Sequence, residues 1–226
     1  MRSCNNRVSQ FRNQTIVTIR FAAALTAAVA LPAVFAPVAA LAAPAADDLA
    51  QVQKSLEAMS SMTADFTQTD QAGKVLTGTL TIKKPGKIRF QYQQGVPLLI
   101  VGDGKNVYFI DYSVDQVQRW PVGGSPLSVL IDPSKNVSRF AHIVPGGDPR
   151  IVSVEVNDPN HPEYGRITLV FARSDSAPGG LLLQGWVALD AQNNRTTIRL
   201  ANQKFNGAVS EIMFRWNDPR HKTHGR

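Results

Sequence analysis

The side chains most often used in catalysis are few in this sequence and do not form a grouping that an enzyme needs. The four histidines are scattered along the chain, at His142, His161, His221 and His224. Only the last two are close in sequence, and an i, i+3 pair by itself is a weak signal for a metal site. Histidines in loops rich in proline and glycine are ordinarily solvated. The sequence therefore predicts no metal site and no cofactor.

Nucleophilic and acid–base chemistry are equally unsupported. Cys4 is the only cysteine, and no Gly-x-Ser-x-Gly sequence provides an activated serine. Several carboxylates lie in turns, where they cap backbone N–H groups more readily than they transfer protons; these are Asp103, Asp132, Asp148, Asp158 and Asp218. Gly102-Asp103-Gly104 is not followed by a glycine-rich loop leading into a helix, so it predicts no phosphate site. The residues favour a protein that is not an enzyme, and an exported hydrolase is the least favoured alternative.

The first 42 residues have the pattern of a secretory leader. They contain no acidic residue and four arginines, at Arg2, Arg7, Arg12 and Arg20. An apolar run follows over Phe21–Leu31, and Ala40-Leu41-Ala42 supplies the small residues that signal peptidase reads. The alternative, a transmembrane helix, would need about 20 apolar residues, and Pro32 and Pro37 interrupt this one. We predict a cleaved Sec signal peptide over residues 1–42 and one mature domain over residues 43–226.

Removal of this leader changes what the charge implies. The whole chain carries a net charge of +7, which falls to +3 when the four leader arginines are removed. Much of the basic excess that suggests nucleic-acid binding therefore disappears, and we expect no nucleic-acid partner. The mature part is long enough for a single domain with a substantial core. Cys4 leaves with the leader, so no disulfide forms and no cysteine at the cleavage point can carry a lipid anchor.

One amphipathic helix is predicted at the start of the mature chain. Asp47 or Asp48 can cap it. Apolar residues then recur at three- and four-residue spacing, which places them on one face of a helix; they are Leu49, Val52, Leu56, Met59 and Met62. Such a stripe is suited to covering a sheet.

The apolar period then changes from about 3.6 to two. The alternation is clearest over Lys87–Gln93, where Ile88, Phe90 and Tyr92 share one face. Further strand-like runs, separated by turn residues about every ten positions, are Lys74–Lys83, Leu98–Val101, Val107–Tyr112, Gln116–Val122, Ile151–Val156, Arg166–Arg173, Leu181–Asp190, Arg195–Phe205 and Val209–Trp216. This pattern is typical of an antiparallel meander or barrel. Its concave face can be filled by its own side chains or leave a cavity for a lipid, and the pattern does not decide between these.

An apolar insert interrupts the strands over Ser125–Ala141. Ser125 can cap a helix and Pro126 suits its first position, so short helical pieces are expected. An insert of this kind usually covers a curved sheet. The predicted fold is therefore mainly β with some α, a single half-open antiparallel β-barrel of about ten to eleven strands covered by the N-terminal amphipathic helix and short mid-chain helices.

Several segments, in order, resemble the periplasmic outer-membrane lipoprotein carrier family of the LolA type. They are Asp65–Gln68, Gly78–Phe90, Val101–Asp111, and Arg199–Asn206 with Phe214–Trp216, and the strongest part runs from Asp65 to Val122. Each motif is weak alone, but their order and spacing behind a Sec leader make the resemblance fairly specific. The family's pattern has arginine where this sequence has Lys84.

The resemblance implies a periplasmic chaperone, or shuttle, that binds the acyl chains of lipoproteins released from the inner membrane and delivers them to the outer membrane. Its implied partners are acylated lipoproteins, an inner-membrane ABC-type release complex and an outer-membrane acceptor, and the protein itself would be monomeric. Two alternatives share the fold: the acceptor, which is lipid-anchored and so poorly matched by a cysteine-free mature chain, and a lipid- or lipoprotein-sensing regulatory module.

Candidate residues for the acyl-chain cavity follow from the alternation on the strands and the helical spacing in the covers. They are Val52, Leu56, Leu80, Ile82, Ile88, Phe90, Tyr92, Phe109, Leu127, Leu130, Leu169, Phe171, Leu183 and Trp186. Ile88 follows the Lys84-Pro85-Gly86 turn and is expected near the cavity mouth. The resemblance makes Lys84 the candidate latch for the helical lid, although lysine lacks the planar five-donor fork of arginine.

Overall fold

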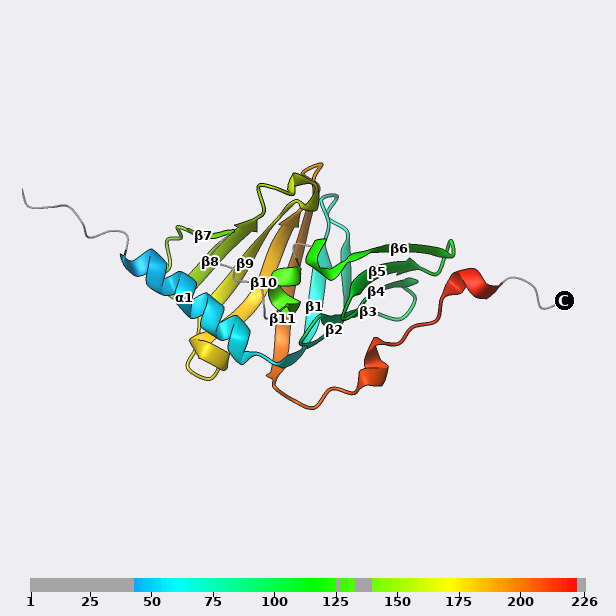
Figure 1. Cartoon of the computed structure of the whole chain (residues 1–226), viewed down its shortest axis with the longest axis horizontal. Coiled ribbons are helices and arrows are strands. Elements are labelled where there is room, and N and C mark those ends of the chain that lie inside the picture. The colour runs from blue at the N-terminus through cyan, green and yellow to red at the C-terminus, as the bar shows by residue number, and fades with distance from the viewer. Residues whose placement is uncertain (1–42, 125–126, 133–139, 223–226) are drawn as a thin grey trace, which may run out of the picture. The chain divides into compact units, whose positions relative to one another are not determined.

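Eleven antiparallel strands form a single sheet that curves without closing on itself. The computed structural model describes residues 43–124, 127–132 and 140–222. The strand order is β6-β5-β4-β3-β2-β1-β11-β10-β9-β8-β7, so neighbours in the sheet are consecutive in sequence except where β1 pairs with β11. Strands β6 and β7 lie at opposite ends of this order (Figure 1). The half-open antiparallel barrel predicted from the sequence is thus confirmed.

The strands run over Ser61–Thr69 (β1), Val75–Lys83 (β2), Lys87–Tyr92 (β3), Leu98–Asp103 (β4), Asn106–Asp111 (β5), Gln116–Pro121 (β6), Ala141–Val144 (β7), Ile151–Asn157 (β8), Arg166–Arg173 (β9), Leu181–Leu189 (β10) and Arg195–Phe205 (β11). The short strand β7 was not predicted. It pairs with β8 at the edge of the sheet.

The predicted two-residue alternation places the core on the concave face. In β3 the side chains of Ile88, Phe90 and Tyr92 are buried, and each alternates with a more exposed residue. The same alternation buries Ile167, Leu169 and Phe171 in β9. Because successive side chains of a strand point to opposite faces, both halves of the sheet direct their apolar faces to one shared core.

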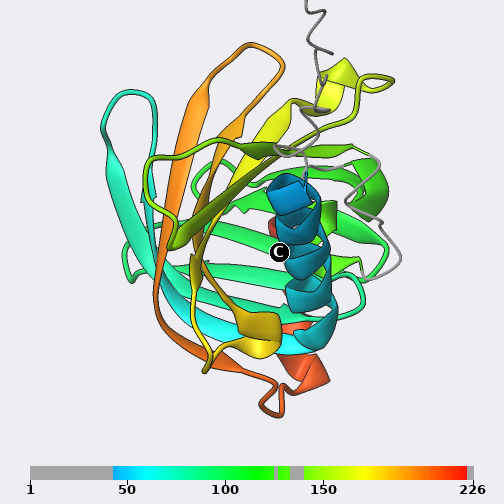
Figure 2. The same cartoon turned by 90° about the vertical axis from the view of Figure 1, so that its left-hand side faces the viewer.

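The helix α1 (Ala43–Ala58) lies across the concave side near β7–β10, as Figures 1 and 2 show. Val52 and Leu56 from its apolar stripe are buried in the core. The helix begins earlier than the predicted cap at Asp47 or Asp48, since Pro44 is tolerated in a first helical turn. Met62 was predicted on the helix stripe but belongs to β1, because the chain has already turned into the sheet there.

A second, very short helix covers the centre of the concave face. Helix α2 (Ser128–Ile131) has all four of its side chains buried. Its end is attached to the sheet, since the backbone N–H of Gly86 donates to the carbonyl of Ile131 at 2.7 Å. The cap predicted at Ser125 and Pro126 lies outside the described residues, as does the predicted leader.

The segment after β11 is not the strand that the sequence predicted over Val209–Trp216. It contains instead a 3₁₀ helix, η5 (Glu211–Phe214). The segment packs on the outer face of β3 and β4, where Phe214 joins a second buried cluster with Leu99, Val101 and Ile110. Strands β4 and β5 are apolar on both faces, so their outer face also needs a cover.

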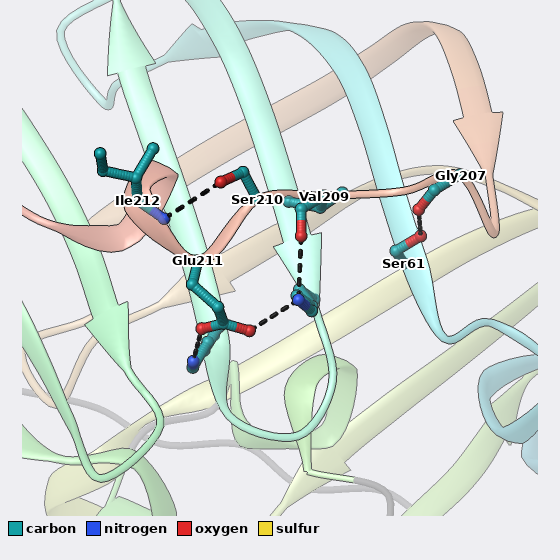
Figure 3. Close-up of polar contacts among 8 residues, drawn as sticks. Ser61, Gly207, Val209, Ser210, Glu211 and Ile212 are labelled. Carbon is teal, nitrogen blue, oxygen red and sulfur yellow. Dashed lines mark hydrogen bonds and ion pairs between the residues drawn. The ribbon is translucent and has the colours of Figure 1, made fainter.

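Ion pairs hold this C-terminal segment on the strands (Figure 3). The ammonium of Lys83 lies 2.6 Å from one carboxylate oxygen of Glu211, and that of Lys87 contacts the other. Lys83 also donates to the carbonyl of Val209 at 2.9 Å. Hydrogen bonds from Lys83 and then Lys87 lower the pKa of Glu211 to about 2. Glu211 is therefore ionised at neutral pH.

Candidate functional site

A cavity of about 290 Å³ remains at one end of the concave face. Its walls come from β1, β3, β4, β9, β10 and β11, from Tyr164 and the β10–β11 turn, and from Leu127, which precedes α2. The apolar lining consists of Phe90, Ile100, Leu127, Ile167, Trp186, Ala188, Leu189 and Ile198. A largely apolar, concave cavity of this size is the usual form of a binding site for a small apolar group.

The rings of Phe90 and Trp186, which line this cavity, belong to a set of edge-to-face aromatic contacts that extends into the core. Phe66 meets Phe90 and Tyr92 edge to face, in each case with 5.3 Å between ring centroids. Phe90 in turn meets Trp186 at 6.1 Å. Such T-shaped pairs stabilise a core by about 0.5–1.5 kcal/mol beyond the area they bury. The rings therefore hold the cavity wall in place when the cavity is empty.

Only part of the predicted lining borders this cavity. Phe90, Leu127 and Trp186 line it, and Phe109 is half-buried opposite Ile100. The other predicted residues are packed in the core itself; they are Val52, Leu56, Leu80, Ile82, Ile88, Tyr92, Leu130, Leu169, Phe171 and Leu183. Side chains of α1 and α2 thus fill most of the concave face in the structure.

The expectation that Ile88 lies near a cavity mouth is wrong. Its side chain is fully buried and pairs with Ile82 beside the Lys84 turn, at the end of β1–β3 away from the cavity. A glutamate at this position would bury an unpaired carboxylate, which is costly in an apolar core. Such a substitution is therefore expected to destabilise the fold.

The polar rim of the cavity was not predicted. Besides its apolar wall, the cavity is lined by Gln68, Tyr164, Asp190, Asn194 and Thr196. Alternation identifies apolar positions and says nothing about polar ones at strand ends. The sequence did contain one indication of this rim. Asp190 and Asn194 flank a recognisable hairpin turn, and a turn that follows β10 directly lies at the end of that strand's apolar face.

The turn between β2 and β3 contacts both covering helices. The ammonium of Lys84 donates to the carbonyl of Leu56, near the C-terminus of α1, where helix geometry favours a cation. Burial lowers the pKa of Lys84 to about 8, and the nearby carboxylate of Glu57 opposes this shift. The bond from Lys84 to Leu56 attaches α1, and the bond from Gly86 to Ile131 attaches α2. Both attachments therefore lie at the same end of the sheet, at the turn between β2 and β3.

Helix α1 is also fixed on its other side, by the connection between β9 and β10. Arg173 pairs with the carboxylate of Asp48. The hydroxyl of Ser55 donates to the carbonyls of Pro178 and Leu181, at 2.7 and 3.0 Å. Pro178 begins a short 3₁₀ helix, η4 (Pro178–Gly180), which packs against α1. Lys84 is therefore one of several contacts that hold α1 closed.

The described residues, 43–124, 127–132 and 140–222, contain no group of three or more His, Cys, Asp or Glu side chains that could hold a metal ion. They also contain no helix that is both long and apolar enough to cross a membrane.

Comparison with known proteins places this architecture in a family. Residues 57–217 match the family model described as outer membrane lipoprotein carrier protein LolA. The chain belongs to this family, whose members are binding proteins rather than enzymes. The resemblance noted from the sequence motifs is thus confirmed.

Individual relatives share modest identity with the chain. An outer-membrane lipoprotein carrier protein of Chromobacterium violaceum is 39% identical over 100 residues, which cover 41% of this chain and 48% of the relative. One from Neisseria meningitidis serogroup B is 28% identical over 191 residues, covering 81% and 87%. An uncharacterized protein of Rickettsia prowazekii is 35% identical over 92 residues, covering 41% and 38%. The chain therefore spans less than half the length of two of these relatives.

Among solved structures, the chain is similar to a LolA superfamily protein from Nitrosomonas europaea. The TM-score is 0.44 at 12% sequence identity, over 76% of this chain and 97% of that one.

Proposed function

We propose that this protein is a periplasmic carrier that shields the acyl chains of lipoproteins between the inner and the outer membrane. The observation that carries the proposal is the apolar cavity on the concave face, bordered by Leu127 just before α2, in a chain of the lipoprotein carrier family. The leader predicted over residues 1–42 would direct the domain formed by residues 43–226 to the periplasm. An ABC-type release complex would supply the cargo, and an outer-membrane acceptor would receive it from the monomeric carrier.

The size of the cavity requires the covering helices to move when cargo binds. About 290 Å³ lies at the small end of the range of about 300–1,000 Å³ that is usual for sites of drug-sized ligands. Several acyl chains need more space, which Val52, Leu56 and Leu130 would vacate if α1 and α2 moved outward. Exposing a few hundred Å² of apolar surface costs several kcal/mol at about 25 cal/mol per Å². Bound acyl chains would offset this cost by covering the same surface.

A binding experiment with a defined lipopeptide tests the proposed carrier function. The mature chain, residues 43–226, is expected to co-elute in gel filtration with a synthetic triacylated lipopeptide in a complex of one chain. The same peptide without its acyl groups should elute separately, because the cavity recognises apolar chains and not peptide sequence. Co-elution of both peptides, or of neither, would contradict the proposal.

We further propose that Lys84 acts as a latch on the closed lid. Support comes from its hydrogen bond to Leu56 of α1. One hydrogen bond contributes about 0.5–1.5 kcal/mol net, less than the several kcal/mol associated with lid opening, and at neutral pH the cost of burying the ammonium opposes part of this contribution. Lys84 would therefore tune the closed population without determining it alone.

The latch should respond to pH. In the closed state the pKa of Lys84 is about 8, whereas an exposed lysine titrates near about 10.4. The closed state therefore binds fewer protons between these pH values, so raising the pH through this window should increase the closed population. Spin labels on cysteines that replace Lys54 of α1 and Lys105 of the β4–β5 turn would measure the separation of helix and sheet.

The matched variant for this measurement is Lys84→Arg, because a guanidinium stays charged across the same pH range. Its label distances are expected not to change between about pH 8 and 10. Lys74→Met, at the opposite end of β2, controls for the loss of a surface lysine and should retain the wild-type response. An unaltered pH response in Lys84→Arg would rule out Lys84 as its source.

A further inference from the structure

The rim of the cavity is where the polar end of a bound acyl chain must lie, if the proposed carrier function holds. Five polar residues border the cavity, and they come from three separate connections or strand ends: Gln68 from β1, Tyr164 from the β8–β9 connection, and Asp190, Asn194 and Thr196 from the β10–β11 hairpin. The opposite wall is aromatic and aliphatic. An amphiphile would therefore bind with its tail against Phe90 and Trp186 and its polar group at this rim.

The orientation of one rim side chain makes it a hydrogen-bond donor to the ligand. The phenol of Tyr92 donates to the side-chain oxygen Oε1 of Gln68 at 2.8 Å. Burial raises the pKa of Tyr92 to about 12, so the phenol keeps its proton. With Oε1 occupied, the two N–H groups of Gln68 remain, and no acceptor in the described part of the chain is paired with them. An ester or amide carbonyl in the cavity could accept one of these bonds.

A second rim residue carries a fixed negative charge. Asp190 accepts the backbone N–H groups of Gln192 and Asn194, at 2.9 and 2.8 Å, and the side-chain amide of Asn194 at 2.8 Å. These bonds, led by those from Asn194, lower the pKa of Asp190, so its carboxylate is ionised at neutral pH.

No lysine or arginine appears among the described residues that line the cavity. The nearest arginine in sequence, Arg195, borders a groove with Asp70, Thr197 and Arg199. Ile198 of the same strand lines the cavity, and alternation along β11 places Arg195 and Thr197 on the other face of the sheet. Among the described residues, the lining of the mouth therefore presents neutral donors and one anion, and no cation that would receive a negatively charged head group.

From these features we infer that the mouth selects acyl chains by their head group, favouring a neutral ester or amide over an anionic carboxylate or phosphate. Gln68 would donate to the carbonyl of the neutral ligand, and Asp190 would repel an anion. This inference rests on the proposed acyl-chain binding and adds a selection to it. An acylated lipoprotein carries its chains as esters and amides, whereas fatty acids and membrane phospholipids bring a negative charge to the mouth.

The test compares two ligands with the same saturated chain, a monoacylglycerol and a fatty acid, at pH 8. Each competes with a fluorescent acyl probe for the purified mature chain. The wild type is expected to bind the monoacylglycerol about threefold more tightly, because the exposed carboxylate of Asp190 acts through solvent and its repulsion is weak. Asp190→Asn keeps an oxygen for the backbone N–H groups but removes the charge, so it should strengthen fatty-acid binding and bring the two affinities together.

Two further variants separate the roles of charge and donor. Asp70→Asn changes an equivalent hairpin aspartate, which accepts the N–H of Lys74 and lies outside the cavity, and it should leave the preference unchanged. Gln68→Met in a Tyr92→Phe background removes the amide together with its phenol partner, so no buried hydroxyl is left unpaired. This double variant should weaken the binding of both ligands, because a carboxylate accepts an N–H bond as an ester carbonyl does, and it should not abolish the preference that Asp190 produces.

Equal affinity of the wild type for both ligands would overturn the inference and leave the carrier proposal standing. A preference for the monoacylglycerol that persists in Asp190→Asn would also overturn the inference and leave the carrier proposal standing. Failure of the wild type to bind either ligand, when its thermal transition is normal, would overturn the carrier proposal and the inference together. Thermal melting of each variant confirms that the affinities compare folded proteins.

Discussion

Replacing Ala188 with phenylalanine is expected to abolish acyl-chain binding and to leave the fold intact. Ala188 lines the cavity beside Trp186 and Ile198, on the concave face of β10. A phenyl ring at this position would occupy the empty volume and remove apolar surface from water, so stability should be unchanged or higher. The lipopeptide co-elution described above measures the loss, and thermal melting measures the stability.

The adjacent residue provides the control for this variant. Val187 follows Trp186 in β10 and points to the other face of the strand, and it does not border the cavity. Val187→Phe adds a ring of the same type outside the site and should bind the lipopeptide as the wild type does. Normal binding by Ala188→Phe would show that acyl chains occupy some other part of the protein.

A single methyl group at Gly179 is expected to loosen the helix α1 and to destabilise the whole domain. Gly179 has φ +66°, and a Cβ atom there would lie 2.5 Å from the Cα of Ser55 in α1. Two costs therefore combine in Gly179→Ala. The left-handed backbone costs about 1–2 kcal/mol, and the collision with a helix backbone adds about 1–3 kcal/mol of overpacking. Loss of the close contact should also expose the apolar face beneath α1, which a hydrophobic dye detects.

A glycine in an open turn carries only the first of these costs, so comparison with it measures the second. Gly73 has φ +81°, but a Cβ atom there would meet no atom within 4 Å. The loss of stability in Gly73→Ala therefore comes only from the left-handed backbone conformation. At about 2–4 °C per kcal/mol for a domain of this size, Gly179→Ala should melt several degrees below Gly73→Ala. Equal melting temperatures and equal dye binding would show that α1 does not depend on this contact.

The sequence alone determined the family, the class of fold and the inward face of its strands. The alternation of Ile88, Phe90 and Tyr92 with polar residues assigned one face of β3, and burial follows that assignment. The apolar stripe of Val52 and Leu56 likewise identified the buried face of α1. These features depend on periodicities of two and 3.6 residues, which are local properties of a chain and can be read without knowing its partners.

Only the tertiary structure decided which of those inward residues border an empty volume. Leu80 and Trp186 both alternate inward, yet Trp186 lines the cavity and Leu80 is sealed in the core. The difference depends on where α1 and α2 insert their side chains, and this packing involves residues far apart in sequence. Alternation therefore predicts a buried face but cannot distinguish a filled part of it from an open one.

The same reason explains the error at the C-terminal segment. Val209–Trp216 has apolar residues at strand-like positions, but the segment packs as the 3₁₀ helix η5 and its flanks against Leu99, Val101 and Ile110. Ion pairs from Lys83 and Lys87 to Glu211 fix it there, across more than 120 residues of chain. The sequence also did not predict that Lys84 bonds to the carbonyl of Leu56, or that Gln68 and Asp190 share a polar rim. Each of these contacts forms where the curved sheet brings distant strand ends and helices together.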